Sequence, residues 1–312
     1  MSDFRTQLKR GLYGGARKGW SSFVWICKIV VPVSFLVALL QWGGWLNQLD
    51  YLLNPLMGLI NLPAEAVLPI ITGMLIGPPA VIAIITVLPF TIEQMTLIAI
   101  FTMIAHMLII EGIIQFKAGM GAIKITLVRI AAAIITVLIV SQFFGDTGQS
   151  VVIPPELMMH IPFVEALWVW AIEMIWLLIR ILIIIMVVMV ILESLQCLGW
   201  VKYLHRFFRP FMRIMGLPDQ AVMMWVAAVV FGIVYGSAVI LEEAKKGTLT
   251  REELEPLHIS IGINHSIVED PALFVALGLS AFWLLVPRFI MAIVAVQAYR
   301  AVKLLKNRSL HK

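Results

Sequence analysis

The chain has 312 residues, of which 61% are hydrophobic and 13% charged, and its mean hydropathy is +0.99. A soluble domain of this length could not bury so many apolar side chains, and the apolar runs lack the alternation of membrane β-strands. The net charge of +5 does not indicate nucleic acid as a partner, because the basic residues occupy positions that membrane topology explains. The composition therefore predicts an all-α polytopic protein whose main partner is the lipid bilayer.

The first half opens with a basic segment followed by long apolar runs. We expect residues 1–19 to form a cytoplasmic arm, and the apolar run after it to be a retained membrane helix, since no cleavable signal peptide is evident. Ala64–Phe90 is also apolar but is interrupted at Gly77-Pro78-Pro79. Crossing a ~30 Å hydrocarbon core takes roughly 20 residues. Three spanning helices are predicted in this half, over Trp20–Gln41, Ile92–Phe116 and Ile123–Phe144.

A polar loop over 145–165 leads into the second half, where the pattern recurs. Gln220–Leu241 is apolar and is interrupted near Gly232 and Gly236, and a basic tail follows over 303–312. Three further spanning helices are predicted, over Ala166–Gln196, Leu257–Leu279 and Phe282–Ala301.

Residues with special backbone or charge properties recur at constant offsets, which predicts an internal duplication. Seven of them return 155 positions later: Pro55, Met57, Leu62, Pro63, Ala66, Val67 and Gly77. From His106 onward the offset is 159, with the pairs His106/His265, Glu111/Asp270, Gly119/Gly278 and Arg129/Arg288. Four extra residues in the charged loop 242–255 account for the change. We therefore predict one repeat over 20–144 and a second over 166–302.

The distribution of Lys and Arg predicts how the two interrupted segments lie. If Ala64–Phe90 crossed the membrane, the basic loops could not all face one side. If it enters and leaves on the same side, turning at Gly77, the basic loops and both termini face the cytoplasm. Gln220–Leu241 then forms a second hairpin. Each repeat has three spanning helices and one re-entrant hairpin, so the repeats are inverted in the inner membrane. The alternative is that each interrupted segment is one kinked spanning helix.

Two histidines near the middle of predicted spans are the leading candidates for a substrate site. Ionisable groups at membrane depth usually serve a site or a fixed ion pair. His106 and His265 correspond in the two repeats, and Asn264 and Glu269 enrich the second copy. His265 and Glu269 are four residues apart and would share one helix face, where they could bind a cation, relay a proton or contact a polar solute. Pro271 is expected to break this helix.

The acidic and arginine residues that follow these histidines in the sequence are predicted to have a structural role. Glu111–Arg129 and Asp270–Arg288 are predicted to form interhelical ion pairs, one in each leaflet. Such pairs contribute little net stability, because desolvation offsets the attraction.

The hairpin tips complete the predicted substrate site. The first tip presents mainly backbone at Gly77 and Pro78, and the second offers Tyr235 and Ser237. Half-helix termini at such tips carry partial charges that hold ions or anionic groups.

These features resemble the nucleoside-recognition, or Gate, domain family. The residues that carry the resemblance are Gly77-Pro78-Pro79-Ala80, His106, Glu111, Arg129, the segment from Asn264 to Asp270, and Arg288. The family includes the spore maturation proteins A and B, and it is related to the membrane domain of the ferrous-iron transporter and, distantly, to the concentrative nucleoside transporters. The resemblance implies a transport role. The chain departs from the iron transporters in having no cysteine at the first hairpin tip.

The sequence predicts a transporter-like protein without a cofactor. We expect it to move a nucleoside, a nucleobase, another small polar solute or a cation, and a homo-oligomer is compatible with the sequence. Divalent metal-ion transport and a non-transporting membrane partner or assembly factor are the alternatives. No resident metal is expected, because Cys27 and Cys197 do not form a ligand pattern. No enzymatic activity is expected, because no nucleophile–base pair, phosphate loop or zinc spacing is evident.

Overall fold

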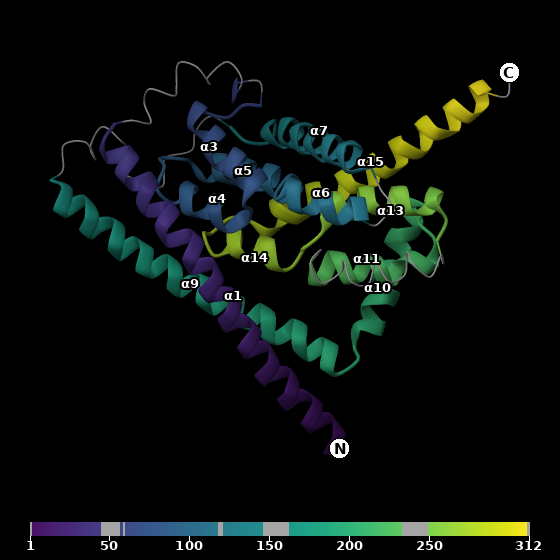
Figure 1. Cartoon of the computed structure of the whole chain (residues 1–312), viewed down its shortest axis with the longest axis horizontal. Helices are drawn as coiled ribbons and strands as arrows, with labels where there is room; N and C mark the ends of the chain where they lie inside the picture. Colours follow the sequence, from purple (N-terminus) through teal and green to yellow (C-terminus); the bar gives the residue numbers. More distant parts are fainter. Residues whose placement is uncertain are drawn as a thin grey trace.

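The computed structural model describes residues 2–44, 57–58, 60–117, 121–145, 162–232 and 249–310. Within these ranges the chain is helical and contains no β-strand, as the composition predicts (Figure 1). The α-helices are α1 (Ser2–Trp42), α3 (Val67–Leu75), α4 (Pro78–Ile85), α5 (Ile92–Ile104), α6 (Leu108–Lys117), α7 (Ala122–Ser141), α9 (Phe163–Cys197), α10 (Val201–Met215), α11 (Val222–Phe231), α13 (Arg251–Asn264), α14 (Glu269–Val275) and α15 (Ala281–Leu310). Two 3₁₀ turns, η2 (Ala64–Ala66) and η3 (Asp219–Ala221), precede α3 and α11.

Five segments of the described chain are long and apolar enough to cross a membrane. They are Phe4–Trp42, Ile92–Lys117, Ala122–Ser141, Phe163–Cys197 and Ala281–Leu305. A multi-pass helical membrane protein is thereby confirmed. The sixth predicted span, Leu257–Leu279, is not among them, because it is divided between α13 and the short helix α14.

The basic segment 1–19 is not a separate arm, because α1 begins at Ser2 and runs unbroken to Trp42. With 41 residues this helix is about 60 Å long. Its basic part packs against the end of α9, where glycines allow close contact: a Cβ on Gly11 would lie 2.7 Å from Ser194 Cα, and one on Gly15 would lie 2.5 Å from Val190 Cα. Residue numbers increase along α1 while the numbers of the residues that it contacts in α9 decrease, so the two helices are antiparallel. The glycine spacing, rather than the charge, is the sequence signal for this packing.

The two halves share one order of helices with matching boundaries. The helices α3 and α11 start 155 residues apart, and α5 and α13 start 159 residues apart, as do α7 and α15. Their caps correspond as well: Thr91 and Gln94 form a capping box at α5, and Thr250 and Glu253 form one at α13. The duplication predicted from a few residues therefore extends to the helix boundaries in the described chain.

The first interrupted segment is a helical hairpin. Gly77 has φ +118°, a conformation that few residues other than glycine adopt, and it joins α3 to α4. Gly73 and Val81 lie equally far from this turn, and a Cβ on Gly73 would be 2.7 Å from Val81 Cγ2. The two helices are therefore side by side. In the second half α11 ends at Gly232, which has φ +86°, and the rest of that predicted hairpin lies outside the described residues.

Candidate functional site

Both predicted histidines lie at breaks between two helices, not within continuous ones. His106 lies between α5 and α6, and His265 lies between α13 and α14. The residue after each histidine has positive φ, +45° at Met107 and +52° at Ser266. Strained backbone of this kind costs on the order of 1–3 kcal/mol per residue and concentrates at functional sites. Pro271 lies in the first turn of α14, where a proline is tolerated, so the prediction that it ends the helix is wrong.

The hairpin helices support these breaks through backbone hydrogen bonds. The amide of Met107 donates to the carbonyl oxygen of Gly73 at 3.1 Å. At the corresponding position, the amide of Ser266 donates to the carbonyl oxygen of Ala228 at 3.4 Å. Each break is therefore bonded to the helix that begins the interrupted segment of its own half, α3 in the first and α11 in the second.

Two buried arginines hold the broken ends in the same way. Arg129 Nε donates to the carbonyl oxygen of Ile104 at 2.8 Å, and its Nη2 donates to that of His106 at 2.9 Å. Arg288 Nη2 donates to the corresponding carbonyl oxygens of Ile263 and His265, at 3.2 and 2.9 Å. These bonds satisfy carbonyl groups that a helix end leaves without partners, and the cation offsets the negative end of the helix dipole.

The two predicted ion pairs differ in the structure. Glu111 Oε2 and Arg129 Nη1 are 2.5 Å apart, so this pair forms. Asp270 and Arg288 do not form the second pair within 4 Å in the described chain, and Asp270 Oδ2 lies 3.5 Å from His106 Nε2 instead. Glu111 also reaches both histidines, so it does not pair with Arg129 alone. The prediction of a second contact ion pair, Asp270–Arg288, is therefore wrong.

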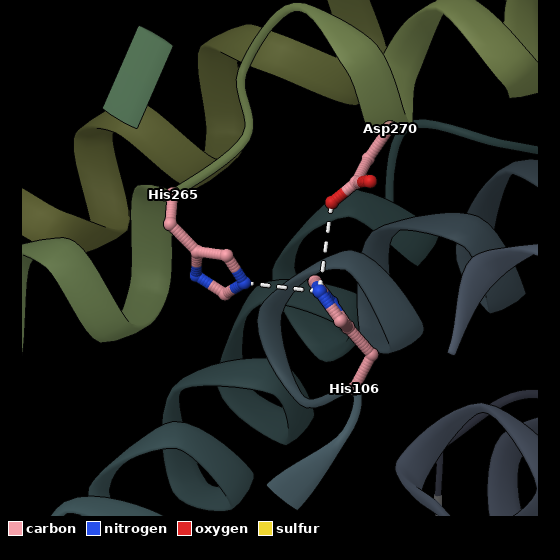
Figure 2. Close-up of side chains that lie close together, drawn as sticks. All are labelled: His106, His265 and Asp270. Atoms are coloured by element: carbon pink, nitrogen blue, oxygen red, sulfur yellow. Dashed lines mark hydrogen bonds and ion pairs between the residues drawn. The ribbon is translucent and has the colours of Figure 1, made fainter. Parts of the chain in front are cut away.

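Four ligand-type atoms from the two halves converge at one buried point. His106 Nε2 and His265 Nε2 are 2.9 Å apart, and Figure 2 shows the two rings and Asp270 pointing toward one another. Glu111 Oε1 is 2.9 Å from His265 Nε2 and 3.2 Å from His106 Nε2. These residues are at most 9% exposed. His106, His265 and Asp270 together have the spacing of a metal-binding group.

The hydrogen bonds of the histidine rings determine which of their nitrogens carry protons. His106 Nδ1 is 3.0 Å from the carbonyl oxygen of Thr102, and His265 Nδ1 is 3.1 Å from that of Ile261. A carbonyl oxygen only accepts, so we assign a hydrogen to each Nδ1. In neutral rings both Nε2 atoms then present lone pairs to each other and to Glu111 Oε1. A backbone carbonyl on the far nitrogen is also the usual support of a metal-binding histidine.

The remaining predicted site residues lie around this cluster or outside the described chain. Asn264 is buried at the end of α13, whereas Glu269 begins α14 and does not share a helix face with His265, because the break separates them. Gly77 approaches the break, since a Cβ there would lie 3.0 Å from Met107 Cγ. Pro78 is buried at the first position of α4. Tyr235 and Ser237 lie outside the described residues.

The fold and the site define a multi-pass, all-helical membrane protein with a buried polar centre. The chain is similar to the uncharacterized membrane protein YvoD of Bacillus subtilis (strain 168), with 25% identity over 298 residues that cover 92% of each chain. No family model and no solved structure matches the chain. The resemblance to the Gate domain family therefore stays a prediction.

Proposed function

We propose that this protein is a membrane transporter that carries a divalent transition-metal cation through the buried cluster. The observation that supports this proposal is the convergence of His106 Nε2, His265 Nε2, Glu111 Oε1 and Asp270 Oδ2. With both Nδ1 atoms protonated toward carbonyl groups, the inward-facing atoms are lone-pair donors. Such atoms repel one another unless a cation lies between them.

The distances suit a small metal ion. Metal–ligand distances of about 2.0–2.1 Å in a tetrahedral site place neighbouring ligand atoms roughly 3.3 Å apart. The separations of 2.9 Å between the two Nε2 atoms and 3.5 Å between His106 Nε2 and Asp270 Oδ2 bracket this value, and His106, His265 and Asp270 offer ligand atoms that all lie within 4.8 Å of one another, so side-chain movements would complete the site. Two imidazole nitrogens and two carboxylate oxygens favour Zn²⁺, Fe²⁺, Mn²⁺ or Co²⁺ over Mg²⁺ or Ca²⁺, which prefer oxygen alone.

The net charge of the cluster favours a transport site, from which the ion is released, over a structural site that holds its ion permanently. The carboxylates of Glu111 and Asp270 are balanced by the guanidinium groups of Arg129 and Arg288, so the cluster is formally neutral when both imidazoles are neutral. Structural zinc sites instead surround the ion with up to four ligands, often thiolates. A neutral site binds a dication more weakly, as a transport site requires.

The proposed topology is an inverted repeat of six spans and two re-entrant hairpins, with both termini cytoplasmic. The antiparallel packing of α1 and α9, which occupy corresponding positions in the two halves, supports the inversion. Broken helices meeting near the midplane are the usual site of such transporters. In this arrangement α5–α6 and α13–α14 are the two broken spans.

A nucleoside fits this cluster less well. The 2.9 Å between the two Nε2 atoms leaves no space for a base between the histidines in this conformation. The cation is therefore the substrate class that the geometry supports best.

The test is uptake into proteoliposomes of Zn²⁺, Fe²⁺, Mn²⁺, Co²⁺ and a panel of nucleosides. We expect uptake of at least one metal, and a loss of about tenfold or more in His265→Ala, as for removal of a metal ligand. The control is Thr136→Val, which removes a buried hydroxyl bonded to the Ala132 carbonyl of its own helix, and whose uptake should stay within about twofold. Metal uptake that survives His265→Ala contradicts the proposal. A folded protein that moves none of these solutes and retains a protein partner through purification supports an assembly role instead.

A further inference from the structure

We propose that a polar route, formed by α13 with α6 and α7, connects the central cluster to the membrane face that carries Lys124, while apolar side chains close the symmetry-related route to the opposite face. This inference rests on the proposed cation transport, and it names the side from which the site is loaded or emptied.

The route follows one face of α13. Glu255, His258, Gly262 and His265 are spaced by three, four and three residues, which places them on one stripe of a helix. The ten residues from Glu255 to His265 rise about 15 Å. This is half of a ~30 Å hydrocarbon core, the distance from a midplane site to one membrane face.

Polar groups of α6 and α7 face this stripe along its length. At the inner end His265 contacts Glu111 of α6. One turn back, a Cβ on Gly262 would lie 3.3 Å from Arg129 Cδ and 3.4 Å from Gln115 Nε2, so the glycine leaves room for both side chains. At the outer end the partly exposed pair Glu255–Lys124 closes at 3.1 Å.

Two groups beside the stripe are buried and lack partners. Gln115 and His258 are each 1% exposed, and neither Gln115 Nε2 nor His258 Nε2 has a hydrogen-bond partner in the described chain. Leaving such a group unsatisfied costs about 1–3 kcal/mol. A passing cation could bind the free nitrogen of His258, and its hydration waters could accept from the Gln115 amide.

Most of the equivalent positions in the first repeat and on its partner helices are apolar. An offset of 159 relates His258 to Ala99, Gly262 to Met103 and Gln115 to Phe274. Ala99, Met103 and Phe274 are fully buried, and Trp283 replaces the lysine at position 124. Thr96, which corresponds to Glu255, bonds its hydroxyl to the Ile92 carbonyl of its own helix. The helices of the two repeats correspond here, but the polar side chains of the route occur in only one of the two symmetry-related places.

Cysteine labelling of symmetric positions tests the route without requiring transport. In full-length protein carrying Cys27→Ser and Cys197→Ser, the variants are His258→Cys with Ala99→Cys, and Gln115→Cys with Phe274→Cys. A membrane-impermeant cationic methanethiosulfonate is applied from each side of oriented vesicles. We expect His258→Cys and Gln115→Cys to react about tenfold faster than their counterparts, and only from the Lys124 side, because a thiol reacts where it is accessible. Equal rates, reversed sides, or no reaction at all four positions overturn the route.

A transport measurement completes the test. Gly262→Val should obstruct the route and lower metal uptake about tenfold, while Zn²⁺ binding to the purified protein stays within about threefold of the wild type. Met103→Val is the symmetric control, and it should leave both metal uptake and Zn²⁺ binding within about twofold. Loss of Zn²⁺ binding in Gly262→Val would indicate damage to the cluster. In that case the labelling rates of the cysteine pairs decide whether the polar route exists. One-sided labelling without any metal uptake would refute the proposed transport but support the polar route. Metal uptake with equal labelling of the symmetric positions would refute the polar route alone.

Discussion

Replacement of the two buried arginines by methionine should have unequal costs, although the arginines occupy equivalent positions. Arg288→Met leaves the carbonyl oxygens of Ile263 and His265 without their donor, at about 1–3 kcal/mol each before relaxation. Arg129→Met removes the equivalent bonds to Ile104 and His106. It also leaves the buried carboxylate of Glu111 unpaired.

The unpaired carboxylate determines the size of the difference. Breaking a buried ion pair by removing one partner costs about 3–5 kcal/mol. Arg288→Met loses less, because Asp270 lies more than 4 Å from Arg288 and no contact ion pair between them is broken. We therefore expect Arg129→Met to lower the free energy of unfolding by about 2–3 kcal/mol more than Arg288→Met. Adding Glu111→Gln to Arg129→Met should recover most of this excess, because the unpaired charge is then absent.

The assay is reversible unfolding in mixed detergent micelles, followed by circular dichroism for the wild type, both single variants and the double variant. Equal losses for the two arginines would refute the reasoning and restore the symmetric ion pairs that the sequence alone predicts. A double variant as unstable as Arg129→Met would show that the backbone carbonyl bonds, and not the carboxylate, determine the loss.

Three further predictions concern packing, the hairpin turn and the ligand set. Gly15→Leu should separate α1 from α9 and cost about 3 kcal/mol or more. Gly112→Ala, where the nearest atoms are 3.7 Å away, should instead stabilise the helix by about 0.5–1 kcal/mol; thermal unfolding compares them, and equal melting temperatures would contradict the packing. Gly77→Ala should cost about 1–3 kcal/mol, because its φ of +118° strains any side chain, and an unchanged unfolding midpoint would refute this. Asp270→Asn should weaken Zn²⁺ binding about tenfold in calorimetry, whereas Glu269→Gln should stay within about twofold; the reverse order would restore Glu269 as a ligand.

The duplicated sequence predicts much of the fold, because proline, glycine and charged residues fix local geometry wherever they occur. Gly77 and Gly232 both have positive φ, as their place in the repeat requires. The breaks after the histidines were not predictable in this way. Met107 and Ser266 adopt positive φ although neither is a glycine; their amides bond to carbonyl groups of α3 and α11, and the arginines bond to the carbonyl groups of the histidines before them.

The sequence identifies candidate residues of the site, but it does not predict which of them contact one another. His106 and His265 stand out in the sequence as ionisable groups in apolar segments. Glu111, predicted to be a structural partner of Arg129, also lies within 2.9 Å of His265 in the other half. No spacing rule within one helix reveals a contact between residues 154 positions apart. The same limit explains why Glu269 was preferred on its i,i+4 spacing, which the helix break removes.

The unequal carboxylates suggest how a symmetric scaffold selects a direction. Glu111 is held by Arg129, so part of its charge is already neutralised before a cation arrives. Asp270 Oδ2 has no hydrogen-bond donor among the described residues, and it faces the shared centre. At 4 Å and an effective dielectric constant of 20, a unit charge gains about 4 kcal/mol from such a carboxylate. An incoming cation would therefore engage Asp270 with little competition, and it would have to compete with Arg129 for Glu111. Because Glu111 lies on the polar route and Asp270 lies on the apolar side, the order of these two contacts would follow the direction of movement.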